Sequence, residues 1–125
     1  AVPDNFLFVT GKDGSEEIKL TDWEYAGMQD PHLDVAMFII YAMYDRDSAE
    51  KLIDLYFSDG CDKATRLKIY CYIAVSGLVW SNWCEFKRHC GVEFGAYTQR
   101  QYDYAREYSE IFFREYREVF GRDYV

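Results

Sequence analysis

The Asp13-Gly14 dipeptide stands between two short β-prone segments, residues 6–10 and 17–21. An Asp-Gly pair between two such segments is a strong signal for a β-hairpin. The start of the chain is therefore restricted to a two-stranded antiparallel ribbon, and the register of this ribbon decides which of its polar side chains meet.

A turn centred on this dipeptide also sets the register of the strands, because the numbers of paired residues then sum to 27. In that register Leu7 faces Leu20, and Val9 faces Ile18. These four residues form one apolar face, in keeping with the period-two alternation of a strand.

The same register places Asn5 opposite Asp22 at the open end of the hairpin. Directly opposed strand residues have Cα atoms about 4.5–5.5 Å apart, so two oxygen-bearing side chains would meet at this point. Mg²⁺ prefers such hard oxygen ligands and takes few of them from the protein. A magnesium site is one interpretation of this pair, and a turn-capping amide beside an ordinary surface carboxylate is the other.

The rest of the chain has the pattern of helices that end at glycine residues. We expect four helices, over residues 30–44, 47–57, 62–89 and 97–120. The first would open with Asp30 as its N-cap and Pro31 in its first turn. Gly77 lies inside the third helix, where glycine costs up to about 1 kcal/mol relative to alanine, so we expect it to pack closely against a neighbour. The expected fold class is mainly α with one short β-hairpin.

The charge balance and the cysteines exclude several kinds of function. The net charge of −8 repels the phosphates of nucleic acids and suits a cationic small molecule or a metal ion. The longest apolar stretch, residues 35–44, is shorter than the roughly 20 residues that span a membrane. Four cysteines without a CxxC pair indicate reduced thiols in a cytoplasmic protein. The spacing of Cys84, His89 and Cys90 does not fit a zinc site.

Aromatic residues make up 19% of the chain, and several of them recur at helical spacing. Trp80 and Trp83 are three residues apart, so both indoles project from one helix face. Tyr104 and Tyr108 share a face of the last expected helix in the same way. Such stripes are typical of core packing. Aromatic faces also hold quaternary ammonium groups, which cannot hydrogen-bond through their methyl groups.

Five short motifs follow one another along the chain: PDNFLF at 3–8, DWEYAG at 22–27, DPHLDVA at 30–36, GLVWSNW at 77–83 and GVEFG at 91–95. In this order they resemble the choline/ethanolamine kinases, and in particular the bacterial LicA-type choline kinases. The resemblance covers nearly the whole chain. It implies the helical C-terminal lobe of a protein-kinase-like fold, shared with the aminoglycoside phosphotransferases, in an enzyme that transfers the γ-phosphate of ATP to the choline hydroxyl.

The resemblance also implies roles for individual residues. Asn5 and Asp22 match the family's magnesium-binding positions, in a metal-binding hairpin region at residues 1–30. The family's catalytic base, an Asp in a His-x-Asp motif, would fall just before Ala1, and the ATP-binding N-terminal lobe would also precede this chain. We therefore expect residues 1–125 to be a single lobe fragment that holds no catalytic residue and is inactive alone.

Residues 31–125 would form the helical substrate-binding region for choline or a similar small amine. The residues that the resemblance suggests for it carry aromatic rings or, in one case, a counter-charge: Trp80, Trp83, Phe94, Tyr97, Tyr104, Tyr25 and Glu24. Asp34, in the first turn of a helix, would either complement the helix dipole or brace the catalytic loop.

Two other functions stay open. A primary ammonium group needs hydrogen-bond acceptors, so a pocket ringed mainly by carboxylates would favour an ethanolamine or aminoglycoside kinase. An aromatic face left exposed without the N-terminal lobe would instead suit a non-catalytic helical binding module or a homodimer.

Overall fold

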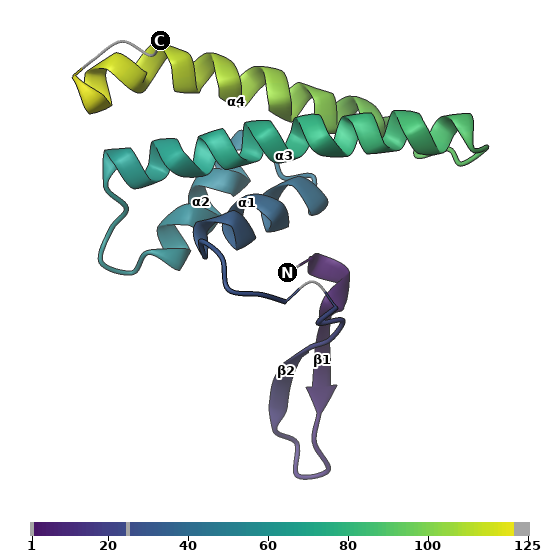
Figure 1. The fold of residues 1–125 in the computed structure, drawn as a ribbon. Coiled ribbons are helices and arrows are strands. Elements are labelled where there is room, and N and C mark those ends of the chain that lie inside the picture. Colours follow the sequence, from purple (N-terminus) through teal and green to yellow (C-terminus); the bar gives the residue numbers. More distant parts are fainter. Residues whose placement is uncertain (1, 25, 122–125) are drawn as a thin grey trace.

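The structure, a computed structural model, describes residues 2–24 and 26–121. Within these residues it is mainly helical with one antiparallel hairpin, as the sequence predicts (Figure 1). A short 3-10 helix, Pro3–Asn5, leads into strands β1 (Phe6–Thr10) and β2 (Glu16–Leu20). The helices are α1 (His32–Tyr41), α2 (Arg46–Tyr56), α3 (Lys63–His89) and α4 (Ala96–Phe120).

The register of the hairpin differs from the predicted one by one residue, because the numbers of paired residues sum to 26. Phe6 pairs with Leu20, so the predicted pairs Leu7–Leu20 and Val9–Ile18 are wrong. Strand β2 also begins and ends one residue earlier than predicted.

The turn explains this shift. The amide of Gly14 donates to the carbonyl of Gly11, and the amide of Gly11 donates to the carbonyl of Ser15. Gly14 has a φ of 82°, in the left-handed region. This is a type I turn followed by a left-handed glycine, which makes a three-residue loop where the prediction assumed two residues. The Asp13 side chain accepts hydrogen bonds from the amide and the hydroxyl of Ser15, which holds the loop in this form.

Helix α1 ends at Tyr41, three residues before its predicted end. The amide of Tyr44 donates to the carbonyl of Ile39, the amide of Met43 donates to that of Ile40, and Met43 has a φ of 51°. In this Schellman arrangement one left-handed residue closes the helix, and glycine usually occupies that position. Since a methionine gives no such signal in the sequence, the prediction ran too long.

The other three helices begin and end within one residue of their predicted positions. Asp45 caps α2 by accepting from the amide of Ser48, and Asp62 caps α3 by accepting from the amide of Thr65. Residues of this kind define helix starts from local sequence alone, so these bounds were predictable.

The close packing predicted at Gly77 is confirmed. A Cβ atom at this position would lie 2.6 Å from the carbonyl oxygen of Gln101 and 2.9 Å from Cβ of Tyr104. Any larger residue would push α3 and α4 apart, so Gly77 sets the spacing of these two helices, which lie side by side (Figure 1).

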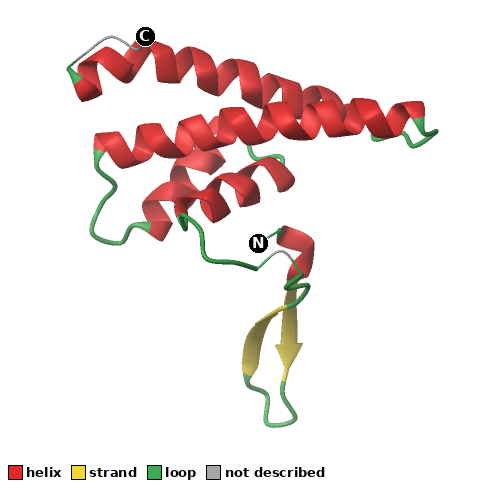
Figure 2. Cartoon of the chain, in the orientation of Figure 1, coloured by secondary structure: helices red, strands yellow, loops and turns green. Residues whose placement is uncertain are grey.

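The core lies where α3 packs against α4 on one side and against α1 and α2 on the other (Figure 1). The hairpin, yellow in Figure 2, extends away from this helical body. Among its strand residues Phe6 and Leu20 are half-buried and the others are exposed. Phe6 packs edge to face against Phe38 of α1, with ring centroids 5.7 Å apart, which joins the base of the hairpin to the helices.

Two further expectations concern the whole chain. Along residues 2–24 and 26–121, no helix has both the length and the apolar character needed to cross a membrane. The four cysteines are free thiols: Cys84 is buried, Cys90 is exposed, and Cys61 and Cys71 lie between these extremes.

Candidate functional site

A cavity of about 880 Å³ lies between the base of the hairpin and the helices. One wall comes from the segment before β1 and from the linker between β2 and α1, residues 21–31. The opposite wall comes from α1, α3 and the start of α4. Most of the predicted site residues line this cavity: Asn5, Asp22, Asp34, Trp80, Trp83, Phe94 and Tyr97.

Asn5 and Asp22 lie on the same side of the cavity. The predicted pairing of Asn5 with Asp22 is wrong by one residue. The carbonyl oxygen of Asn5 accepts from the amide of Thr21 at 3.0 Å, so the residue opposite Asn5 is Thr21, and Asp22 follows it directly. Asp22 has a φ of 60°, an uncommon conformation for a residue other than glycine, although aspartate tolerates it. Backbone strain of this kind is concentrated at functional sites.

The donor atoms on this side suit a hard cation. Asn5 offers an amide oxygen, and the carboxylates of Asp22 and Asp4 belong to residues that line the same cavity. Over the part of the chain that the structure describes, no three His, Cys, Asp or Glu side chains gather into a metal cluster. A cation here would therefore take few ligands from this chain and the others from water or phosphate, as Mg²⁺ does. The residues fit magnesium, and Asn5 and Asp22 would hold it.

The other side of the cavity is a run of aromatic rings, Tyr41, Trp80, Trp83, Phe94 and Tyr97, which we call the aromatic wall. Trp80 stacks on Trp83 with ring centroids 6.1 Å apart, and it meets Tyr41 of α1 edge to face at 5.6 Å. Phe94 lies 5.2 Å from Trp83 and 6.4 Å from Tyr97. Burial raises the pKa of Tyr97, so its phenol stays neutral. Trp83 remains 42% exposed, which leaves ring surface open to a ligand.

Three further residues line the cavity that were not predicted from the sequence: Tyr41, Met37 and Trp23. Met37 and Tyr41 are four residues apart on α1 and so share a face, but core residues have the same spacing. The indole of Trp23 donates to the carbonyl of Leu20 at 2.9 Å, which folds its ring back toward the end of β2. Nothing in the local sequence indicates this bond.

Tyr104, predicted to bind choline, does not line the cavity. Its side chain is fully buried, its hydroxyl donates to the carbonyl of Tyr44, and the guanidinium of Arg100 lies 4.0 Å from its ring centroid. The contact of its Cβ with α3 at Gly77 holds it in the core. The stripe that Tyr104 forms with Tyr108 is therefore core packing.

The remaining predicted residues have different positions. Glu24 is exposed and is not part of the cavity lining. Tyr25 lies outside the described residues. Asp34 lines the cavity from the first turn of α1, where the helix dipole favours a carboxylate. Its role in bracing a catalytic loop stays a prediction.

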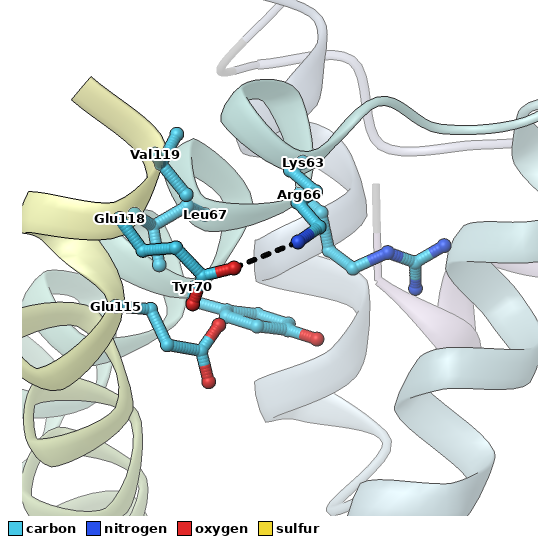
Figure 3. Close-up of a pocket in the computed structure, with 7 residues that line it drawn as sticks. All are labelled: Lys63, Arg66, Leu67, Tyr70, Glu115, Glu118 and Val119. Atoms are coloured by element: carbon cyan, nitrogen blue, oxygen red, sulfur yellow. Dashed lines mark hydrogen bonds and ion pairs between the residues drawn. The ribbon is translucent and has the colours of Figure 1, made fainter. Parts of the chain in front are cut away.

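A second cavity, of about 300 Å³, lies between the start of α3 and the end of α4 (Figure 3). Lys63 and Glu118 form an ion pair across it at 2.8 Å. Tyr70, on the same wall, donates to Glu50, and burial raises its pKa to about 12. Because these polar groups already have partners and no predicted site residue lines this cavity, we place the candidate site in the larger one.

The fold and the larger cavity together define a mainly helical body with one hairpin, in which residues with amide and carboxylate oxygens line the same cavity as aromatic rings. No family model and no solved structure matches the chain. Protein LicA of Haemophilus influenzae (strain ATCC 51907 / DSM 11121 / KW20 / Rd) is 28% identical over 116 residues, a match that covers 83% of this chain and 39% of that protein. Another Protein LicA from Haemophilus influenzae is also 28% identical, with 31% of its length covered. The chain thus spans less than half the length of these curated relatives.

Proposed function

We propose that this chain is the choline-binding and magnesium-binding part of an ATP-dependent choline kinase similar to Protein LicA. One observation carries the proposal: Asn5 and Asp22 line the same cavity as the aromatic wall. The motif resemblance and the 28% identity to Protein LicA support it. In this proposal the chain is the helical C-terminal lobe of a kinase-like fold, and the ATP-binding lobe and the catalytic base belong to other parts of a protein as long as these relatives.

The aromatic wall favours a quaternary ammonium group as ligand. The methyl groups of choline donate no conventional hydrogen bonds, so ring faces within about 6 Å hold the cation, each desolvated contact contributing up to about 2 kcal/mol. Asp22 and Asp34 line the cavity as well and add negative charge. A primary amine would need several acceptors around its nitrogen, whereas rings dominate this wall. The wall therefore favours choline over ethanolamine or an aminoglycoside.

The chain would act by holding its ligands in position, which is the main protein contribution to phosphoryl transfer. When bound, ATP with Mg²⁺ would supply the phosphoryl group and neutralise the charge that develops on it. Asn5 and Asp22 would hold the metal, and the aromatic wall would hold the ammonium end of choline. Their common cavity would leave the choline hydroxyl directed toward the phosphate.

Calorimetric titration of choline and of ethanolamine into the purified chain tests this proposal. We expect choline to bind more tightly than ethanolamine. Trp80→Ala and Trp83→Ala should each weaken choline binding by about 10- to 30-fold, which corresponds to about 1.4–2 kcal/mol. Tyr102→Ala is the control, because Tyr102 is an exposed aromatic residue of α4 outside the cavity lining. Equal affinity for both amines, or choline binding that survives both tryptophan changes, would contradict the proposal.

The outer face of α3 supports a second candidate function, a binding module or homodimer. Residues 69–84 carry no charge, and Val75, Leu78, Val79 and Phe86 are between 48% and 63% exposed. Exposed apolar patches mark protein contact surfaces. Sedimentation velocity at increasing protein concentration tests this: a doubling of mass that Leu78→Glu abolishes supports it, and a monomer at every concentration excludes the homodimer.

A further inference from the structure

Asp30 joins the end of the 21–31 linker to α3 through its side chain. Its Oδ2 atom accepts from Nζ of Lys68 at 2.8 Å and from the hydroxyl of Tyr72 at 3.1 Å. Its Oδ1 atom accepts from the amide of His32 at 3.0 Å. The sequence predicted Asp30 as the N-cap of α1, but Pro31 occupies that position in the structure. The Asp30 side chain instead bonds to both α1 and α3.

The position of this linker matters because it carries one wall of the large cavity. Asp22 and Trp23 belong to the linker, and Trp80 and Trp83 belong to α3. The linker continues from the hairpin at one end and is bonded to α3 by Asp30 at the other. The contact between Asp30 and α3 is therefore one of the points that attach this wall to the helix carrying the two tryptophans.

We propose that Asp30 is a positioning residue, which keeps Asp22 at a fixed distance from the aromatic wall by fastening the linker to Lys68 and Tyr72. The inference rests on the proposed function, because it gives Asp30 a role in the same cavity. Three donors to one carboxylate fix its orientation far better than a single surface ion pair does. The side chains of Asp30 and Lys68 are only 33% and 39% exposed. The Lys68 ammonium, followed by the His32 amide, lowers the pKa of Asp30 to about 2, so its carboxylate stays charged.

Amide hydrogen exchange, measured residue by residue, tests the position of the linker without any ligand. Asp30→Asn keeps an oxygen for the amide of His32 but removes the charge that binds Lys68. The amide of Ala26 donates to the carbonyl of Trp23 at 2.9 Å within the linker. We expect its exchange to become about tenfold faster in Asp30→Asn, while exchange in the buried part of α3 is unchanged. Unchanged exchange at Ala26 overturns the proposal.

Mn²⁺, used as a paramagnetic probe for the magnesium position, gives the functional readout. In the wild type we expect Mn²⁺ to broaden the amide signals of Asn5 and Asp22. Asp30→Asn should weaken Mn²⁺ binding by about tenfold, as loss of a supporting partner around a metal site does. Choline affinity should fall less, because α3 and the start of α4 carry most of the rings. Lys68→Gln should weaken Mn²⁺ binding as Asp30→Asn does, and the conservative change Lys68→Arg should keep the wild-type affinity.

The outcomes separate this inference from the proposed function. Wild-type protein that binds neither Mn²⁺ nor choline refutes the proposed function, and exchange at Ala26 still decides whether Asp30 holds the linker. Wild-type affinity for Mn²⁺ in Asp30→Asn refutes the positioning role alone.

Asp62→Asn is the matched control. Asp62 also accepts a backbone amide at the start of a helix, that of Thr65 at 3.0 Å, but it belongs to the connection between α2 and α3, which contributes no residue to the large cavity. This change should lower thermal stability without altering linker exchange or Mn²⁺ affinity. If Asp62→Asn changes both as much as Asp30→Asn does, the effect of Asp30 is general destabilisation and the proposal is wrong.

Discussion

Replacing Gly77 with alanine tests whether the contact between α3 and α4 is as tight as the structure shows. On helix propensity alone the change would stabilise the protein by up to about 1 kcal/mol. The new Cβ, however, would lie 2.6 Å from the carbonyl oxygen of Gln101 and 2.9 Å from Cβ of Tyr104. Neither atom can rotate away, because one is backbone and the other is fixed to it. The helices must therefore separate, and overpacking of this kind costs up to about 3 kcal/mol. The expected net effect is a loss of about 1–2 kcal/mol in the free energy of unfolding.

Urea unfolding followed by circular dichroism measures this loss. Gly27→Ala is the matched control, because a Cβ at Gly27 would meet nothing within 4 Å. Its free energy of unfolding should stay within about 0.5 kcal/mol of the wild type. Gly77→Ala should also weaken choline binding, since separating α3 from α4 moves Trp83 away from Phe94. A Gly77→Ala protein as stable as the wild type, or more stable, would refute the reasoning.

Three further predictions follow from single contacts. Tyr104→Phe should lower the free energy of unfolding by about 1–2 kcal/mol, because the hydroxyl that donates to the carbonyl of Tyr44 is lost. Calorimetry should show unchanged choline affinity. A large loss of affinity would indicate that Tyr104 belongs to the binding site after all. Asp30 has a pKa of about 2 in the folded protein against an ordinary 3.8, so its stabilising effect is present above about pH 4 and lost as the pH falls to about 2. Between these pH values the melting temperature of the wild type should fall more than that of Asp30→Asn, and parallel curves would contradict the pKa. Lys87→Gln should tighten choline binding by about two- to threefold, because Nζ of Lys87 lies 5.5 Å from the ring centroid of Trp83 and competes with a bound cation. Arg88→Gln is the control. Equal changes in both variants would indicate a general charge effect.

Features that depend on neighbouring residues in the sequence were predictable. The hairpin, the start of α3 at Asp62 and the tight contact at Gly77 were predicted from local chemistry, and the start of α2 was predicted one residue late, at residue 47. The register of the hairpin and the end of α1 were not predictable, because each depends on one residue in the left-handed conformation. Gly14 lengthens the turn by one residue, and Met43 closes α1 without the usual glycine.

The candidate site shows the same division. The spacing of Trp80 and Trp83 predicts a shared face, and the structure places that face on a cavity. Tyr104 and Tyr108 have equivalent spacing but lie in the core, because Gly77 draws α4 against α3 at that level. Spacing along a helix therefore groups residues correctly, but only tertiary packing decides which group faces a ligand.

The exposed hairpin has a thermodynamic consequence. Beyond its base the ribbon has little packing to stabilise it, with Phe8 81% and Ile18 64% exposed, and a two-stranded ribbon alone is at best marginally stable in water. A cation held by Asn5 and Asp22 would bind the hairpin with its strands paired and not the frayed hairpin, so its binding free energy would stabilise the pairing of the strands. Metal binding and pairing of the strands are then coupled in a single equilibrium. Val9 pairs with Glu17 and alternates with the bonded Gly11–Ser15 pair, so its amide faces β2. Protection of the Val9 amide would therefore report metal occupancy from a point remote from the metal.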